Sequence, residues 1–325
     1  MSEIRTTPAY LAFAHLIIDD LALADGTRVY GQLGGAGTYA ALGAALACDE
    51  PVALSCGVGA DLGDAQRARL RAWNIDTTAL TARGPHTPRS SVNYRPDGTR
   101  TEIPLHGLEH FDAMDPAIAD LPPSWTGIRG VYFFAADDAR QWPELLEFAA
   151  ARRATVLWEI SADSCRPEAF DRVAERLREI DVFSINLDEA RALCSAEDPL
   201  TCLERLGSAG SAAVVLRRGA EGSLVANGDR VLIVDAAPVP ALVDPTGAGN
   251  CYSGAFLAAW CQSHDLRSSA ALASAAATRV LGRYGLPPPA PADRTSVRAL
   301  ARRVRVRDTA AAGARTQIPT STEQT

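Results

Sequence analysis

Apolar runs of strand length alternate with amphipathic stretches of helix length over most of the chain. The runs that we expect to form the strands of the main sheet are 10–18, which is largely apolar as in a buried strand, and 51–58, 129–136, 154–160, 181–186 and 211–219. Apolar residues recur at helical spacing in 34–47, 61–74, 143–153, 167–179 and 187–194. Two longer helices, 247–262 and 268–284, follow a hairpin at 222–234. Repeated strand–helix units predict an α/β fold with a doubly wound, largely parallel sheet between two layers of helices.

Two hairpins interrupt this alternation and predict a second, smaller sheet. Asp-Gly pairs, which favour the positive φ of tight turns, occur at Asp25–Gly26 and Asp97–Gly98. Their flanking strands alternate apolar and polar residues, so each strand has one face towards water. We expect the segments 19–33 and 88–104 to pair into one β-sheet lid that covers a site on the main body. An apolar outer face on this lid would favour a homodimer.

The end of the chain predicts a boundary near residue 290. A proline run follows Leu286, and arginines are frequent between 298 and 307. We therefore expect one domain over 1–290 and a basic tail over 291–325, disordered from about residue 309. A solvated terminal helix or strand explains these arginines more simply than a nucleic-acid site does.

Composition narrows the class of partner. The chain has 325 residues, a net charge of −7 and a pI of about 5.3, which argues against a general nucleic-acid binder. Seven cysteines fall in no zinc or CxxC spacing, which indicates free thiols in a reducing compartment. The sequence has neither the pattern of a signal peptide nor an apolar run of membrane-spanning length. We expect a cytoplasmic protein that binds a small molecule, without nucleic-acid or membrane partners.

The turn DPTGAGN, residues 244–250, is the strongest candidate for chemistry. Its glycines let a ligand approach the backbone closely. If a helix starts at this turn, four amides point at one spot that carries the positive end of the helix dipole, which suits phosphate. They belong to Gly247, Ala248, Gly249 and Asn250. A turn that only packs a helix on a sheet is the alternative.

Three other polar features follow predicted strands. In NLDE, Asn186 and Glu189 either cap a helix together, or Glu189 holds Mg²⁺ through water near a nucleotide phosphate. The turn GGAGTY, 34–39, either presents backbone amides to substrate hydroxyls or packs closely on the sheet. Asp19, at the end of the first apolar run, either accepts two sugar hydroxyls or caps a turn.

Two other enzyme classes fit the sequence less well. The segment CGVGADLG, 56–63, follows a strand, and Asp76 lies downstream at a distance typical of a dinucleotide site. Its G-x-G-x-x-x-G spacing is, however, one residue too long, and it does not follow the first strand. The sequence contains no GxSxG motif, and its histidines stand in no recognisable relation to a serine or cysteine nucleophile.

Taken in order, these motifs resemble those of the ribokinase-like (PfkB) carbohydrate kinases. HLIID looks like the family's first strand, GGAGTY its first signature, and CGVGADLG its G-x-D-x-x-G segment. VFSINLDEARAL resembles the N-x-x-E element, and VVLRRGAEGSLV the strand and turn on the nucleotide side. VDPTGAGNCYSGAF is similar to the second signature, usually D-T-x-G-A-G-D. The resemblance covers residues 10–287.

This resemblance implies a three-layer α/β/α ribokinase-like fold with a small lid, ATP and Mg²⁺ as cofactors, and phosphorylation of a hydroxyl on a sugar or nucleoside. The implied substrate residues are Asp19, Gly34, Gly35 and Tyr39. The implied nucleotide residues are Asn186, Glu189, Arg217, Gly219, Gly222, Asp244 and Thr246, with Glu189 bound to magnesium through water. The implied catalytic group is Gly247, Ala248 and Gly249 as an anion hole, together with position 250.

Position 250 departs from the family pattern. The family's aspartate there deprotonates the acceptor, whereas this chain has Asn250, and Tyr39 replaces an asparagine of the first signature. VLWEISADSC and DPTGAGN together resemble a smaller branch, with fungal and bacterial members, that carries this asparagine. A general base contributes about 10²–10⁴ in rate, yet phosphoryl transfer depends mainly on positioning and charge neutralisation.

Three functions therefore stay open at the level of the sequence. The chain is a slow kinase, a nucleotide- or sugar-binding protein without transfer, or a ribokinase fold used for another reaction on a sugar-like or nucleotide-like substrate. From the residues alone, Asn250→Asp is nearly isosteric and is expected to restore a proton acceptor without disturbing folding.

Overall fold

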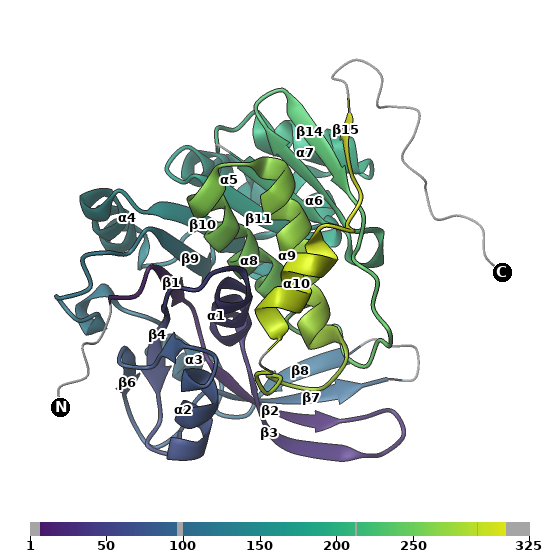
Figure 1. Cartoon of the computed structure of the whole chain (residues 1–325). Coiled ribbons are helices and arrows are strands. Elements are labelled where there is room, and N and C mark those ends of the chain that lie inside the picture. The colour runs from purple at the N-terminus through teal and green to yellow at the C-terminus, as the bar shows by residue number, and fades with distance from the viewer. Residues whose placement is uncertain (1–6, 96–99, 212, 291, 310–325) are drawn as a thin grey trace.

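The computed structural model describes residues 7–95, 100–211, 213–290 and 292–309. Within them, an eleven-stranded sheet has the order β15-β14-β13-β12-β11-β10-β9-β1-β4-β5, and β6 pairs with β4 (Figure 1). The parallel strands are β1 (Tyr10–Phe13), β4 (Val52–Val58), β5 (Ile75–Asp76), β6 (Leu80–Ala82), β9 (Gly130–Ala135), β10 (Thr155–Ile160), β11 (Val182–Asn186) and β12 (Ala213–Arg217). The antiparallel extension consists of β13 (Ser223–Asn227), β14 (Arg230–Val234) and β15 (Val306–Thr309).

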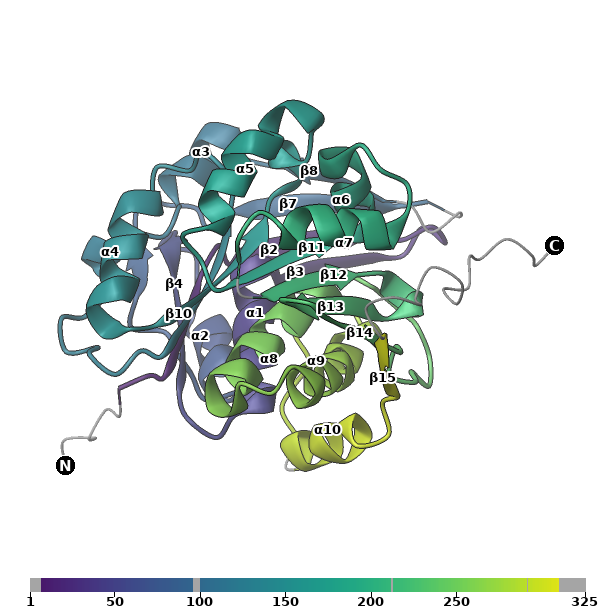
Figure 2. The same ribbon diagram turned by 90° about the horizontal axis from the view of Figure 1, so that it is seen from above.

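Helices cover both faces of this sheet, as Figure 2 shows. One face carries α1 (Ala36–Ala47), α2 (Asp64–Arg71), α8 (Ala248–Ser263) and α9 (Leu266–Leu281), and the other carries α4 (Trp142–Arg152), α5 (Phe170–Leu177), α6 (Leu187–Cys194) and α7 (Pro199–Gly207). Single turns of 3-10 helix occur at Ile118–Asp120, Ala162–Ser164, Pro167–Ala169 and Gly219–Glu221. Alternate residues of β1 enter two separate cores, Tyr10 and Ala12 on the α8 side and Leu11 and Phe13 on the α4 side. The predicted three-layer fold is confirmed.

Helices α1 and α8 cross at unusually short range because both contain glycine at the crossing. A Cβ at Gly43 would overlap the Cys251 carbonyl oxygen, and a Cβ at Gly254 would overlap that of Ala40. Both helices start at the turns that the sequence singled out, so this crossing sets the relative position of those turns. Among the described helices, none combines the length and apolarity that a bilayer crossing requires.

The two predicted hairpins pair into one small sheet. Its strands are β2 (Ile17–Ala22), β3 (Arg28–Gly34), β7 (Arg89–Tyr94) and β8 (Arg100–Pro104), in the order β3-β2-β7-β8. The two hairpins meet where β2 runs parallel to β7. The turn at Asp97–Gly98 lies outside the described residues, and the lid role of the sheet stays a prediction. The short helix α3 (Leu108–Ala113) follows β8.

The first apolar run forms two strands rather than one. The expected strand over 10–18 breaks after Phe13, and β2 begins at Ile17 in the small sheet. Asp19 therefore lies on β2 and not at the end of a strand of the main sheet. Periodicity alone did not reveal the break, because the residues between the two strands are also largely apolar.

The expected boundary at residue 290 is wrong. Helix α10 (Asp293–Ala301) packs on α9, and β15 pairs with β14 at the edge of the main sheet, so the domain extends to Thr309. Val297 is buried, and Leu300 and Val304 pack on the core. The arginines and prolines of this segment obscured that apolar stripe. Residues 310–325 lie outside the described chain.

We expect a chain that ends at residue 289 to lose at least roughly 10 °C of melting temperature, because buried Val297, several partly buried aliphatic side chains and an edge strand are removed together. A chain that ends at Thr309 keeps these contacts and serves as the control. Thermal unfolding of both truncations and of the full chain measures the difference. Equal melting temperatures for the full chain and the shorter truncation would contradict the packing of α10 and β15 on the core.

Candidate active site at the start of helix α8

The turn before α8 presents free backbone amides at the start of the helix. Gly247 has a φ of 77° as the N-cap, which explains the glycine at this position. The Ala248 amide donates to the carbonyl of Pro245 at 3.2 Å, so it is already engaged. This corrects the expectation that four amides point at one spot. In the described part of the chain, the amides of Gly247, Gly249 and Asn250 have no backbone acceptor, so three of them are available to an anion.

Arg217, the last residue of β12, lies against this helix start. A Cβ at Gly249 would overlap Nη1 of Arg217, so the guanidinium fits there only because residue 249 is glycine. Nη2 of Arg217 forms an ion pair with Oε1 of Glu159 at 2.9 Å. Nε of Arg217 is buried without a hydrogen-bond partner in the described residues. The site therefore has a fixed positive charge beside the free amides, and Nε of Arg217 is available to donate a further hydrogen bond.

Asn250 belongs to a buried polar network. Its side-chain Nδ2 donates to Oε1 of Glu159 at 3.0 Å and to the hydroxyl of Tyr132 at 3.1 Å. The Tyr132 hydroxyl donates in turn to Oε2 of Glu159 at 3.0 Å. Glu159 is only 3% exposed. Burial, and next the neighbouring Glu159 carboxylate, raise the pKa of the Tyr132 hydroxyl well above its ordinary value, so this hydroxyl stays protonated.

Asn186 and Glu189 form a complete capping box at the start of α6. The Glu189 amide donates to Oδ1 of Asn186 at 2.9 Å, and the Asn186 amide donates to Oε2 of Glu189 at 3.0 Å. The capping alternative from the sequence is thus what the structure contains. Burial raises the pKa of the Glu189 carboxyl, although Arg217 opposes this effect. Oε1 of Glu189 has no partner among the described residues, so the cap leaves one carboxylate oxygen available.

The first-signature turn surrounds a buried carboxylate. Asp19 is 6% exposed and has no hydrogen-bond partner among the described residues. Burial, together with the nearby carboxylates of Glu102 and Asp244, raises the pKa of Asp19 to about 7. A Cβ at Gly34 would overlap Oδ2 of Asp19, so glycine is required for the carboxylate to occupy this place. A buried carboxylate without a partner costs folding free energy and is typical of a binding site.

Two other residues of this turn have packing roles. Gly35 has a φ of 89°, and a Cβ there would lie 2.6 Å from the His15 carbonyl oxygen. Tyr39 is buried, and a Cβ at Gly247 would overlap its ring. Tyr39 thus joins the two signature turns by direct packing. Whether its hydroxyl also meets a substrate stays a prediction.

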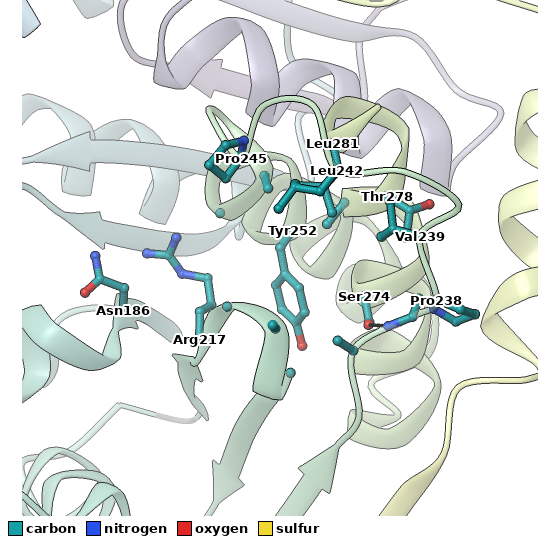
Figure 3. A pocket seen from close by; sticks show the side chains of 18 residues that line it. Asn186, Arg217, Pro238, Val239, Leu242, Pro245, Tyr252, Ser274, Thr278 and Leu281 are labelled. Atoms are coloured by element: carbon teal, nitrogen blue, oxygen red, sulfur yellow. Dashed lines mark hydrogen bonds between the residues drawn. The ribbon is translucent and has the colours of Figure 1, made fainter. Parts of the chain in front are cut away.

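A largely apolar pocket of about 630 Å³ opens beside the start of α8. Figure 3 shows Asn186 and Arg217 at one end of it and Tyr252 near its centre. Gly219 and Gly222 line it, and a Cβ at Gly222 would overlap the Val234 carbonyl oxygen. Its apolar walls include Ala237, Val239, Leu242, Ala277 and Leu281. The pocket therefore combines an apolar chamber with a cationic, amide-lined end.

Residues 134–293 match the sequence profile of the pfkB family carbohydrate kinases. This chain contains a PfkB-family carbohydrate kinase domain. Two relatives match most of its length. An uncharacterized protein of Schizosaccharomyces pombe is 25% identical over 307 residues, covering 83% of each chain, and the cytidine kinase of Thermococcus kodakarensis is 26% identical over 289 residues, covering 85% of this chain and 96% of the relative.

Solved structures support the same fold for this PfkB-family chain. The putative ribokinase II from E. coli, solved with ATP and Mg²⁺, superposes with a TM-score of 0.74 over 91% of this chain and 99% of the other, at 18% identity. The ribokinase-like fold is thereby confirmed. The family match and the cytidine kinase relative support a kinase-like enzyme.

The sequence pointed to both signature turns of the PfkB-family chain but missed four side chains. Tyr94 of β7 donates to Oδ1 of Asp244 at 2.8 Å, and Arg100 of β8 donates to Oγ1 of Thr246 at 2.5 Å. These contacts join the small sheet to the turn before α8, and they engage two residues that we expected to bind nucleotide. Tyr132 and Glu159 were missed as well. A single glutamate within the apolar run TVLWEI was the signal that could have found Glu159.

Proposed function

We propose that this protein is an ATP-dependent phosphotransferase that acts on a hydroxyl of a sugar or nucleoside-like small molecule. The observation that carries the proposal is the start of α8, where three free amides lie beside the Arg217 guanidinium and where Arg217 and Gly249 line one end of an apolar pocket. An apolar chamber suits a purine ring, and the cationic end suits its phosphates. The proposed nucleotide orientation places the base near Tyr252 and Leu281 and the phosphates near Gly247 and Gly249.

Magnesium fits the residues at this end of the pocket. Mg²⁺ in such sites keeps several waters and is held by one or two carboxylates together with substrate phosphates. Glu189 has one carboxylate oxygen free of the capping box, so it can hold a metal-bound water. The described residues contain no cluster of three or more His, Cys, Asp or Glu side chains arranged as a metal cage, which is consistent with a metal carried in with the nucleotide. The metal would neutralise charge on the phosphates when bound.

The acceptor is proposed to bind at Asp19, which is not among the residues that line the pocket. An ionised carboxylate accepts two hydrogen bonds and therefore suits a pair of neighbouring hydroxyls on a sugar or ribose ring. The cytidine kinase relative supports a nucleoside-like acceptor as one member of this class. The small sheet would cover this acceptor, held to the turn by Tyr94 and Arg100.

In the proposed reaction the acceptor oxygen bonds to the γ-phosphorus while the bond from phosphorus to the bridging oxygen breaks. The bridging oxygen keeps the electron pair and leaves on ADP, and the hydroxyl proton passes to water. Free amides at the start of α8 and Arg217 stabilise the charge on the transferred group. Asn250 cannot take the proton, but its carbonyl oxygen can accept the hydroxyl's hydrogen bond and orient it.

A nucleotide-binding protein without transfer is the second candidate function. Both bonds of the Asn250 amide nitrogen go to Glu159 and Tyr132, and no carboxylate stands on the helix in place of a base. The same pocket and anion site would then serve binding alone.

Incubation with ATP, Mg²⁺ and a panel of sugars and nucleosides separates the two functions. ADP formation that depends on one acceptor, together with the phosphorylated acceptor by mass spectrometry, is the expected result. Stabilisation of the fold by ATP without any product would favour the binding protein. A protein that neither binds ATP nor forms product would overturn both.

We also propose a homodimer through the small sheet. Tyr30 on β3 is 61% exposed, Ile103 on β8 is 53% exposed, and Leu108 just after β8 is 72% exposed. Exposed apolar side chains on both edge strands of the small sheet and at the start of α3 favour association. Ile103→Arg is expected to convert the dimer to a monomer in sedimentation velocity, whereas Ala151→Arg, at an exposed position of α4, leaves it a dimer. A wild-type chain that is monomeric at all concentrations would contradict the proposal.

A further inference from the structure

The orientation of the Asn250 amide is fixed by the chemistry of its partners. Glu159 pairs with the Arg217 guanidinium, and its two oxygens accept the hydrogen bonds from Asn250 and Tyr132. The Tyr132 hydroxyl donates its hydrogen to a hydrogen bond with Glu159, so it can only accept a hydrogen bond from Asn250. Both partners therefore require the amide nitrogen, and the carbonyl oxygen Oδ1 must face away from them. Oδ1 has no partner in the described residues.

Glu159 is the centre of this network. One of its oxygens accepts from Asn250 at 3.0 Å and pairs with Arg217 at 2.9 Å, and the other accepts from Tyr132 at 3.0 Å. Glu159 is only 3% exposed, and burying a carboxylate to this extent costs much of its hydration free energy. Several charge-assisted hydrogen bonds are needed to offset that cost. Strand β10 thus supplies the negative charge that helix α8 lacks at position 250.

We propose that Glu159 is a positioning residue of this site, which holds the Asn250 carbonyl oxygen towards the acceptor and the Arg217 guanidinium against Gly249. It acts through these two side chains and does not itself touch the transferred group. The inference rests on the proposed function for the identity of the acceptor, but the network itself is testable without any turnover.

The pairing changes what a carboxylate at position 250 would do. In Asn250→Asp, an oxygen would replace Nδ2 about 3 Å from Oε1 of Glu159. Two carboxylates at this range cannot both ionise, so one would keep its proton, as in a carboxylate dyad. The expectation from the sequence, that this substitution leaves folding undisturbed and restores a base, is therefore replaced. We expect a base only when the charge of Glu159 is removed at the same time.

A double-mutant cycle tests the network in the ligand-free protein. Asn250→Asp is expected to lower the melting temperature by roughly 5–10 °C at pH 8, because a buried donor becomes a second carboxylate. The loss shrinks at pH 5, since protonation of the pair relieves the repulsion. Adding Glu159→Gln is expected to recover at least half of the loss at pH 8. If Asn250→Asp does not fold, recovery of soluble folded protein by Glu159→Gln is the same readout.

A matched control shows that the coupling is specific. Glu50 forms an ion pair with Arg129 outside this network. Glu50→Gln combined with Asn250→Asp is expected to give additive changes in melting temperature. Wild-type stability in Asn250→Asp at both pH values, or equal recovery by Glu50→Gln and Glu159→Gln, would overturn the proposal.

Turnover supplies the second arm, with the acceptor found in the panel. Glu159→Gln alone is expected to lower kcat at least tenfold with a smaller change in the KM for ATP, because the fold and the pocket stay intact. Asn250→Asp alone stays at or below the wild-type rate, while the double variant exceeds the wild type by up to about 10²–10⁴-fold. Wild-type kcat in Glu159→Gln would overturn the positioning role even if the stability coupling is found. If no acceptor in the panel is phosphorylated, the melting temperatures of the ligand-free variants alone test this inference. Failure of the proposed function is therefore distinguishable from failure of this inference.

Discussion

Gly249→Asp is expected to weaken ATP binding by roughly 10²–10³-fold, equivalent to about 3–4 kcal/mol, while the protein stays folded. A side chain at this position displaces the Arg217 guanidinium and puts a negative charge where the phosphates are proposed to bind. Each charge-assisted hydrogen bond to phosphate contributes about 1.5–3 kcal/mol, so the loss of one or two accounts for this range. Titration calorimetry with ATP and Mg²⁺ measures the change.

The control for this substitution is Gly207→Asp. Gly207 ends α7, and a Cβ there meets nothing within 4 Å, so the same change of residue is made in open space. We expect wild-type ATP affinity in this control. Wild-type affinity in Gly249→Asp as well would mean that the phosphates bind elsewhere on the protein.

The second large effect is expected at Asp19. Asp19→Asn should raise the acceptor KM about 10²-fold, because an amide accepts at only one of the two atoms that the carboxylate offers. With a pKa of about 7, Asp19 is mostly protonated at pH 6 and mostly ionised at pH 8. The wild-type acceptor KM should therefore fall by up to about tenfold over this interval, and the variant should lose this dependence. A wild-type KM that is flat from pH 6 to 8 would contradict the assignment of Asp19 to the acceptor.

The same pKa has an opposite consequence for stability. The folded-state pKa of Asp19, about 7, lies above the value of 3.8 for a free carboxyl. Asp19 therefore contributes stability that is fully present below about pH 4 and is lost as the pH rises through 7, on the order of 4 kcal/mol in all. Asp19→Asn should be more stable than the wild type at pH 8 and show a smaller advantage at pH 5. Thermal unfolding of the ligand-free proteins checks the sign.

The fold was largely predictable because strand and helix alternate with clear periodicity. Parallel order follows from that alternation, and the Asp-Gly turns marked both hairpins of the small sheet. Two features of the fold could not be predicted from the sequence. The break after Phe13 occurs within a run that is apolar throughout, and the apolar stripe of α10 is interleaved with arginines and follows a proline run. In both cases tertiary packing decides where the local pattern is ambiguous.

The site was predictable only where its chemistry lies in one short segment. The turns at Gly34 and Gly247 each carry their glycines together, so both were found. The network around Asn250 combines residues from β9, β10, β12 and α8, which are far apart in the sequence. Strand order brings Tyr132, Glu159 and Arg217 together, and no single segment records that order. Glu159, a charged residue within a buried strand, is the sign of this network that the sequence contains.

The glycine crossing of α1 and α8 bears on how the enzyme can move. Gly43 and Gly254 place the two backbones in contact, so the turn at Gly35 before α1 and the turn at Gly247 before α8 belong to one rigid body. We therefore expect any closing movement over the proposed acceptor to occur in the small sheet and not between α1 and α8. In hydrogen exchange, the amides of α1 and α8 should exchange only through global unfolding. Those of β2 and β7 should exchange through a separate opening of lower free energy, which bound ligand suppresses.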